Sequence, residues 1–216
     1  MDCSVSLGKN GELLDHNKAQ QDFKHSREIT LLIEDMLKRN SIAFDEISAV
    51  AVSEGPGSYT GLRVGVSAAK GICFAKKIPL IAVRTLKIIA KAQQNRLEGA
   101  KYLIPMIDAR RDEVYFQLYD ADLNSLNDAD NTILTSKSFA ELSDSKNSII
   151  CGNAAEKAQN IMENDDFRYF SVPALAEDMV SLSYEAYNTG KFEDLAYFRP
   201  FYLKPPNITK SKKPLF

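Results

Sequence analysis

The chain has 216 residues, enough to bury a substantial hydrophobic core as one large domain or two small ones. Apolar residues make up 44% of the sequence and charged residues 26%, proportions that exclude a disordered chain. The net charge of −2 excludes a general electrostatic attraction to nucleic acid or to an anionic membrane, so any contact with RNA would be local or made through a partner.

The cysteine pattern indicates reduced thiols. Cys3, Cys73 and Cys151 are an odd number, are widely spaced and form no CxxC pair, which is typical of a cytoplasmic protein and not of a disulfide framework. No stretch approaches about 18 consecutive apolar residues, and the sequence does not start with a basic segment followed by an apolar one. We therefore expect a cytoplasmic protein with no membrane partner.

The first hundred residues predict a hairpin followed by alternating helices and strands. The hairpin turns at Asn10-Gly11, a dipeptide that favours a type I′ turn. Apolar residues recur at helical spacing over 29–37, with Ser26 as a candidate N-cap. The predicted strands are 4–7, 12–16, 47–52 and 80–83, and the predicted helices are 29–37, the segment after a glycine loop near residue 57, and 85–95.

The alternation of strands and helices starts again after residue 100. Ser138 and Glu141 have the spacing of a capping box, and a helix is predicted from Pro173 to Gly190 because proline and glycine mark its ends. Strands are predicted at 102–108, 113–120 and 148–151. This order predicts an α/β fold with an N-terminal lobe at 1–100 and a C-terminal lobe at 101–216 that ends in an extended basic tail.

A glycine-rich loop, EGPGSYTGLR at residues 54–63, opens the helix that follows strand 47–52. It lacks the Gly-Lys-Ser/Thr ending of a Walker A loop, and Thr60 stands where the dinucleotide fingerprint needs its third glycine. Two interpretations remain: free amides at a helix start that bind an anion, or a tight strand-to-helix turn with Ser58 as the N-cap. We favour the structural turn.

The helix after this loop consists largely of small residues. Gly61, Gly65, Ala68 and Ala69 lie on one side, with Ile72 a turn further on. Two glycines inside a helix cost about 1 kcal/mol each relative to alanine, so we expect another element to approach the backbone and offset that cost. The element is either the protein's own sheet or a helix of a second chain, and the residues alone do not decide between them.

The sequence offers little for catalysis. Its two histidines, His16 and His25, lie nine residues apart, so it contains no HxxxH or HExxH motif, and it also lacks a GxSxG motif. Charged side chains gather at the turn near residue 110, but a charged turn is more often simply solvated. We predict no catalytic residue, no metal site and no cofactor. The charged side chains at the turn are Asp108, Arg110, Arg111, Asp112 and Glu113.

Four segments together resemble one known family. They are HSREITLLIEDMLKRNSIAFDEISAVAV, SEGPGSYTGLRVGVSAAKGICFAKKIPLIAVRTL, MIDARRDEVYFQLY and FRPFYLKPP, and they are similar to the TsaB (YeaZ) family. The resemblance covers nearly all of the chain, with residues 120–170 the least diagnostic. It implies the two-lobed α/β fold of the actin/sugar-kinase/Hsp70-like superfamily (ASKHA, ribonuclease H-like).

The resemblance also implies a role in the threonylcarbamoyladenosine modification of tRNA. TsaB proteins are understood as non-catalytic subunits that bind a TsaD-type catalytic subunit, with a TsaE-type ATPase as a further partner, a homodimer in isolation, and at most indirect contact with tRNA. The family has also been called an M22-like glycoprotease, and the missing HxxxH motif argues against peptidase activity. The alternative function is a nucleotide-binding ATPase or kinase-like enzyme that uses the glycine loop.

The resemblance places the partner interface on the first helix and on the helix after the glycine loop, while the choice of helix face comes from helical spacing. The interface candidates are Ile29, Ile33, Met36, Gly61, Val64, Gly65, Ala68 and Ile72. The residues that match the signature loop, to which we assign a structural role, are Gly55, Pro56, Gly57, Ser58, Thr60 and Arg63.

One departure from the family pattern concerns the first strand. Family members open with an apolar strand and an acidic-Thr-Ser-type turn, whereas this sequence begins directly with MDCSVSL. That strand is central in the superfamily, so without it we expect unpaired edges on neighbouring strands. We expect the natural protein to have residues upstream of Met1 or a different start. The missing turn contacts phosphate in ATP-using relatives, which argues against nucleotide binding.

Overall fold

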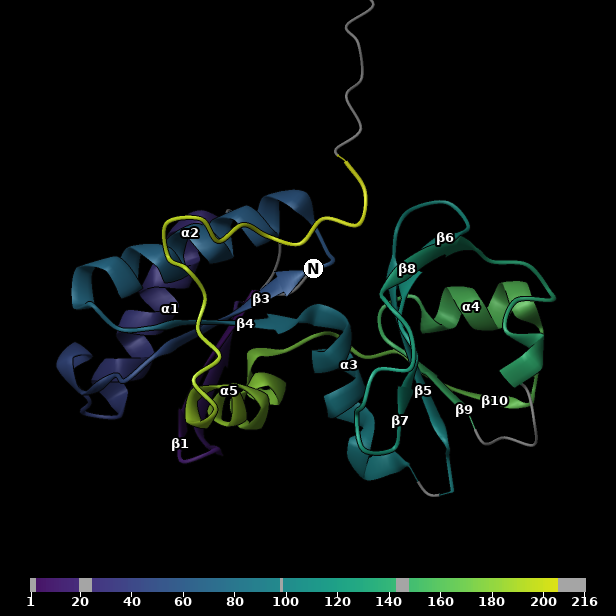
Figure 1. Ribbon diagram of the computed structural model, residues 1–216, viewed down its shortest axis with the longest axis horizontal. Helices are drawn as coiled ribbons and strands as arrows, with labels where there is room; N and C mark the ends of the chain where they lie inside the picture. The colour runs from purple at the N-terminus through teal and green to yellow at the C-terminus, as the bar shows by residue number, and fades with distance from the viewer. Residues whose placement is uncertain (1–2, 20–24, 98, 143–147, 206–216) are drawn as a thin grey trace, which may run out of the picture.

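The computed structural model describes residues 3–19, 25–97, 99–142 and 148–205. Its elements form two groups that lie side by side along the long axis of the molecule (Figure 1). The first group holds β1–β4, α1, α2 and α5, the second holds β5–β10 and α4, and α3 lies between them. This arrangement is the two-lobed α/β architecture expected from the sequence.

The first hairpin pairs β1 (Ser4–Lys9) with β2 (Glu12–Lys18) in antiparallel register. Asn10 and Gly11 have φ angles of 54° and 84°, the two positive values that a type I′ turn requires. The predicted hairpin is confirmed, and each strand extends two residues beyond its predicted range.

A strand–helix–strand unit forms the rest of the first group's framework. α2 (Tyr59–Lys76) connects β3 (Val50–Gly55) to the parallel strand β4 (Leu80–Arg84), and α1 (His25–Arg39) precedes β3. The helices and the strand at 80–83 confirm the prediction. The predicted N-cap role of Ser26 lies outside the side chains that the structure describes.

The strand predicted at 47–52 begins three residues later than expected. Val50 is the first residue to join the ladder, because its N–H donates to the carbonyl of Pro79, the residue just before β4. The N–H of Ile47 instead donates to the carbonyl of Phe44 and closes a 3₁₀ turn. The apolar run is therefore shared between a turn and a strand, which periodicity alone does not separate.

β1 and β3 belong to separate two-stranded sheets. Among the described residues, no strand pairs with the second edge of either one. Unpaired edges on these strands are what the departure from the family pattern predicts. Val5 and Leu7 of β1 pack with Met36 and Leu37 of α1 in a core cluster of their own.

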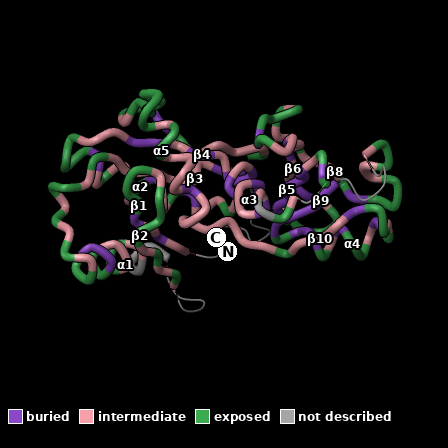
Figure 2. Tube along the Cα trace, turned by 90° about the horizontal axis from the view of Figure 1, so that it is seen from below, coloured by how far each residue is buried: buried purple, intermediate pink, exposed green. Residues whose placement is uncertain are grey.

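The second group is a mixed sheet in the order β10-β9-β5-β6-β8, with the short β7 paired to one end of β5. β9 runs parallel to β5 and β10 parallel to β9, whereas β6 and β8 are antiparallel to their neighbours. Figure 2 shows buried residues concentrated along these strands. The strands are β5 (Tyr102–Asp108), β6 (Glu113–Phe116), β7 (Tyr119–Asp120), β8 (Asp130–Ile133), β9 (Ser148–Cys151) and β10 (Phe167–Phe170).

Helices cover both faces of this sheet. α4 (Ala155–Met162) packs with Ile104 and Ile150 on one face, and α3 (Thr85–Gln93), which continues as a 3₁₀ turn, packs with Leu103 on the other. The sequence predicted α3. It did not predict α4, β8 or β10, and these three elements fall in the segment 120–170.

The single strand predicted at 113–120 is wrong, because the chain leaves the ladder at Gln117 and Leu118. The N–H of Leu118 donates to the side-chain oxygen of Asn127 at 2.7 Å, and the side chain of Gln117 donates to the Asn127 carbonyl at 2.8 Å. The bonds of these two residues thus go to a loop and not to a strand, so β6 ends and β7 begins after them.

The capping box expected at Ser138 does not start an α-helix. The Ser138 hydroxyl accepts a hydrogen bond from the N–H of Thr135 at 2.9 Å, so it closes the turn before it. In the described part of this segment a 3₁₀ turn (Ala140–Leu142) follows.

The helix predicted from Pro173 to Gly190 begins later. A 3₁₀ turn (Ala176–Met179) precedes α5 (Val180–Asn188), and the N–H of Ala176 donates to the Ser4 hydroxyl at 3.0 Å. This bond ties the start of the predicted helix to β1. The predicted stop is confirmed, since Gly190 has a φ of 66° just after α5 ends.

The chain returns to the first group after the second sheet is complete. α5 contacts β1, β2 and β4, and the N–H of Glu193 donates to the carbonyl of Leu80. Phe198 is 8% exposed and packs with Val66 and Cys73. A division at residue 100 therefore separates β4 from the helix that covers it. Residues 206–216, which hold most of the expected basic tail, lie outside the described residues.

Candidate functional site

The glycine loop joins β3 to α2 and is closed by the chain's own C-terminal segment. Gly55 has a φ of 118°, and a Cβ atom on it would lie 2.4 Å from the carbonyl oxygen of Phe201. Both the backbone angle and this close approach require glycine. Ser58 is the N-cap of α2, as predicted, because its hydroxyl accepts a hydrogen bond from the N–H of Gly61 at 3.3 Å. Gly55 is thereby explained without a ligand.

Residues 193–203, here called the C-terminal strap, cross from α5 along α2 to this loop (Figure 1). At the loop, the N–H of Phe201 donates to the carbonyl of Glu54 at 2.7 Å. The guanidinium of Arg84 lies 3.7 Å from the centre of the Phe201 ring, and its Nε is 2.8 Å from the Glu54 carboxylate. The ends of both parallel strands, the glycine loop and the strap therefore meet at one point.

At this point Arg84 pairs through Nε with Glu54, while its Nη1 is buried without a hydrogen-bond partner among the described residues. Burial raises the pKa of Glu54, the positive charge of Arg84 opposes that shift, and the negative charge of Glu193 adds to it. Arg63, further along, stacks on the ring of Tyr59 at 4.3 Å. Arg84 is thus already engaged by a carboxylate and a ring.

α2 presents two rows of side chains. Leu62, Val66, Ala69 and Cys73 are buried against the sheet. The interface candidates on α2 form the adjacent, half-buried row, so Ala69 belongs to the core and not to that row. This half-buried row, here called the α2 stripe, consists of Gly61, Val64, Gly65, Ala68 and Ile72.

Gly65 in the middle of the α2 stripe is not required by packing inside the chain. A Cβ atom there would contact only the side chain of Val52, at 3.7 Å, an ordinary van der Waals distance. Gly71 on the same helix is exposed and a Cβ atom on it would meet nothing within 4 Å. The close approach expected of the protein's own sheet is therefore not what requires glycine at position 65.

α1 contributes a second set of candidates. Ile29 and Ile33 are half-buried, whereas Met36 is only 4% exposed and packs in the core, so it has almost no surface for a partner. Leu31, which the sequence did not single out, is 61% exposed on the same helix. α1 and α2 contact one another.

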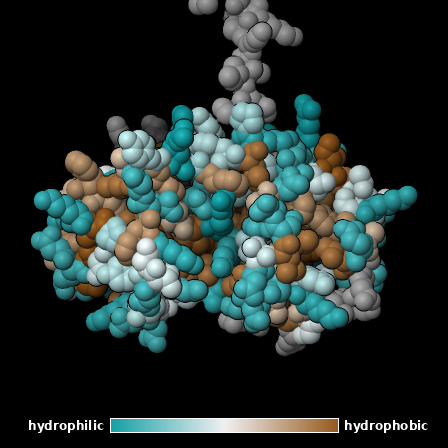
Figure 3. Space-filling model, in the orientation of Figure 1, coloured by the Kyte–Doolittle hydropathy of each residue, from teal (hydrophilic) through white to brown (hydrophobic). Residues whose placement is uncertain are grey.

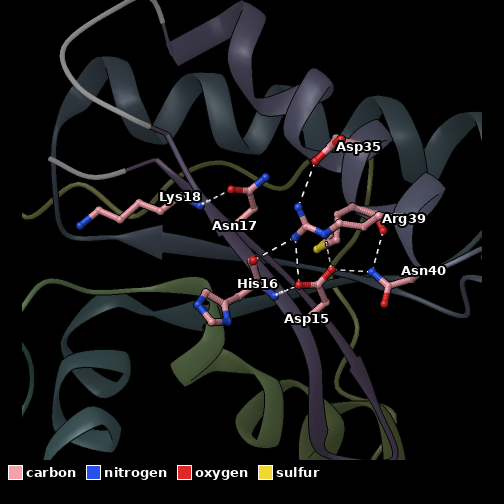
Figure 4. A network of polar contacts seen from close by, with 8 residues as sticks. Asp15, His16, Asn17, Lys18, Asp35, Arg39 and Asn40 are labelled. Carbon is pink, nitrogen blue, oxygen red and sulfur yellow. Dashed lines mark hydrogen bonds and ion pairs between the residues drawn. The ribbon is translucent and has the colours of Figure 1, made fainter.

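A polar network fixes the end of α1 to the first hairpin (Figure 4). Arg39 donates from Nε to one oxygen of Asp15 at 2.6 Å and from Nη2 to the other at 2.9 Å, and it also pairs with Asp35 at 3.0 Å. The side chain of Asn40 and the backbone N–H of His16 donate to the same carboxylate. The bond from Arg39 is the main reason why the pKa of Asp15 falls to about 2.

The charged turn near residue 110 is a structural ion-pair site. Lys157 donates to the Asp108 carboxylate at 2.5 Å and to the Arg111 carbonyl at 2.6 Å, and Lys204 pairs with Glu113. The N–H of Arg110 donates to Asp108. Two of the acidic side chains, Asp108 and Glu113, are held by lysines from elsewhere in the chain, which is the arrangement of a structural cluster.

The described part of the chain places no three His, Cys, Asp or Glu side chains where they could hold a metal ion. Cys73 and Cys151 are buried thiols, and burial raises the pKa of both. A raised pKa keeps a thiol protonated and unreactive. None of the helices in the described residues is long and apolar enough to cross a lipid bilayer.

Comparison with protein families assigns the chain. The family model described as TsaD, tRNA N6-adenosine threonylcarbamoyltransferase, matches residues 13–203. The chain belongs to this family. This member of the family is 34% identical to the tRNA threonylcarbamoyladenosine biosynthesis protein TsaB of Escherichia coli. The match extends over 124 residues, which are 57% of this chain and 53% of the Escherichia coli protein.

Other relatives agree. The TsaB protein of Haemophilus influenzae is 36% identical over 114 residues, which is 53% of this chain and 48% of that protein. A tRNA N6-adenosine threonylcarbamoyltransferase of Bacillus anthracis is 51% identical over 59 residues, 27% of this chain and 17% of that protein. The chain matches about half the length of the TsaB relatives.

Solved structures share the fold. YeaZ from Pseudomonas aeruginosa superimposes with a TM-score of 0.76 at 25% identity, and an uncharacterized Pseudomonas aeruginosa protein with similarity to peptidase YeaZ with a TM-score of 0.79 at 24% identity. Each match covers 94% of both chains. The resemblance to the TsaB (YeaZ) family and the two-lobed fold expected from it are confirmed.

Proposed function

We propose that this chain is a non-catalytic subunit in the threonylcarbamoyladenosine modification of tRNA and that it binds a TsaD-type catalytic subunit through α1 and α2. The observation that carries the proposal is Gly65, a glycine inside a helix that internal packing does not require. Such a residue costs about 1 kcal/mol of helix stability relative to alanine. A partner helix that approaches the α2 stripe closely offsets that cost.

The names of the relatives support the pathway. The matching TsaB proteins are named as threonylcarbamoyladenosine biosynthesis proteins, and the family model is that of the threonylcarbamoyltransferase itself. Asp108 and Glu113 at the charged turn are engaged in ion pairs with Lys157 and Lys204, which supports a binding role over a catalytic one.

The partner surface would combine the two helices. It consists of Ile29 and Ile33 on α1 and the α2 stripe, whereas Leu31 points to the opposite side of α1. We propose that the same surface forms a homodimer in isolation, that a TsaE-type ATPase is a further partner, and that contact with tRNA is at most indirect, in keeping with the net charge of −2.

Complex formation tests the proposal, by size exclusion with light scattering on mixtures with a TsaD-type subunit. The wild type is expected to form a heterodimer and Gly65→Leu to lose it, because the larger side chain prevents close approach. Gly71→Leu is the matched control on another face of the same helix and is expected to bind like the wild type. Thermal melts confirm that both variants fold.

Two results would contradict the proposal: a folded wild type that forms no complex, or equal effects of the Gly65 and Gly71 substitutions. The first result would show that a TsaD-type subunit is not a partner, and the second would show that the interface does not include the α2 stripe.

A further inference from the structure

The C-terminal strap has no regular secondary structure and is held by groups of other elements. Lys70 of α2 donates to the carbonyls of Ala196 and Phe198 at 3.3 and 3.0 Å, and the N–H of Glu193 donates to Leu80. Phe198 fills the core beneath α2. Figure 3 shows that this face of the molecule mixes hydrophobic and hydrophilic side chains over both groups of elements.

The far end of the strap acts on the glycine loop and not on the core. Phe201 is half-buried, and the Arg84 guanidinium stacks on its ring. The N–H of Phe201 donates a hydrogen bond to the carbonyl of Glu54. Its carbonyl occupies the space that a side chain at Gly55 would need. The next residue, Tyr202, places its ring 4.9 Å from that of Tyr59, the first residue of α2.

We propose that Phe201 is a positioning residue, which fixes the glycine loop and the first turn of α2 and so sets the place of the α2 stripe. A loop with glycines at 55 and 57 has wide conformational freedom, so its position must be imposed by what packs on it. The strap supplies that restraint with the hydrogen bond from the Phe201 N–H to Glu54, with the Phe201 ring on Arg84, which itself pairs with Glu54, and with the ring contact between Tyr202 and Tyr59. The consequence for partner binding rests on the proposed function; the restraint on the loop does not.

Phe201 and Phe198 are expected to differ in kind. Phe198 is a core residue, so its loss would lower the stability of the whole first group. The Phe201 ring packs on Arg84 at the loop, so its loss would loosen the loop while the backbone contacts and the core stay in place. Tyr197 offers the matched control, because it lies on the same strap and is 81% exposed.

Hydrogen exchange by mass spectrometry on the full chain tests the restraint. In Phe201→Ala, amides of residues 53–64 are expected to exchange about tenfold faster, the size of effect that losing a cation–π contact can produce. Amides of β5 and β9, whose Ile104 and Ile150 are fully buried, are expected to keep their wild-type rates. Phe201→Tyr, which keeps a ring over Arg84, and Tyr197→Ala are expected to match the wild type.

Loop amides that stay protected in Phe201→Ala would overturn the proposal, and so would faster exchange spread equally over β5 and β9, which would indicate general destabilisation. Loss of protection in Phe201→Tyr equal to that in the alanine variant would overturn the role of the ring.

Titration with a TsaD-type subunit adds a functional measurement. Phe201→Ala is expected to weaken binding about tenfold and Phe201→Tyr to leave it unchanged, since misplacing the first turn of α2 displaces the stripe. Unchanged binding in a variant whose loop is free would refute the link to the stripe. If the wild type does not bind, the proposed function fails while the exchange experiment still decides the restraint.

Discussion

Two aspartates near the first hairpin have pKa values shifted in opposite directions. The pKa of Asp15 is lowered to about 2, mainly by its hydrogen bond from Arg39. The pKa of Asp178 is raised to about 6, first by burial and then by the negative charge of Glu177, while the positive charge of Lys91 opposes the shift. Asp178 lies in the 3₁₀ turn before α5, which contacts β1, β2 and α3. It therefore lies where the returning chain meets the first hairpin and α3.

We predict that Asp178→Asn stabilises the protein at neutral pH. A raised carboxyl pKa means that the folded state holds its proton more tightly than the unfolded state, so the stability contribution is full below pH 3.8 and is lost as the pH rises through about 6. The neutral amide removes that loss, worth about 1 to 2 kcal/mol at pH 7.5 after solvent screening.

Urea unfolding at pH 4 and pH 7.5 measures this difference. The wild type is expected to lose stability relative to Asp178→Asn between the two values. A gap between wild type and variant that is the same at both values would show that Asp178 does not titrate in this range.

At the scale of elements, the sequence predicted those features that depend on residues close together in the chain. The Asn10-Gly11 turn, the Ser58 cap and the small-residue row of α2 follow from side chains within a few positions of one another. The strap contacts did not, because Phe201 and Glu54 are bonded across more than half of the chain. Neither residue carries a motif, and only the glycine at position 55 hinted that something approaches the loop closely.

For α2 we predict that stability and binding separate at two glycines. Gly65→Ala and Gly71→Ala should each raise the unfolding free energy by up to about 1 kcal/mol, because alanine is the better helix former and both positions have room for a Cβ atom. Only Gly65→Ala should weaken association with a TsaD-type subunit, since its methyl group enters the proposed contact.

Thermal melts and titrations on the same samples check this pair. Destabilisation by Gly65→Ala would mean that the chain's own packing does require glycine there. Equal binding by both variants would place the partner elsewhere.

At the scale of the whole molecule, element order predicted the α/β class but not the path of the chain. The sequence predicted lobes at 1–100 and 101–216, and α5 and the strap, which belong to the second range, contact β4 and α2 of the first. Such a return depends on contacts between residues far apart in sequence, which the periodicity of apolar residues does not predict. The fold in turn does not decide between binding and catalysis, because one fold serves many functions. The glycine loop must therefore be tested directly.

We predict that ATP with Mg²⁺ leaves the melting temperature unchanged. The loop is filled by the strap, with Phe201 against Gly55 and Arg84 already paired with Glu54, so a nucleotide would have to displace both contacts. A ligand at a hundred times its dissociation constant adds about 2.7 kcal/mol, which for a chain of this size raises the melting temperature by about 5 to 10 °C. Differential scanning fluorimetry resolves such a shift. A clear shift in the wild type would establish the loop as a ligand site and favour the nucleotide-binding alternative, whereas a shift confined to Phe201→Ala would mean that the strap itself keeps the site closed.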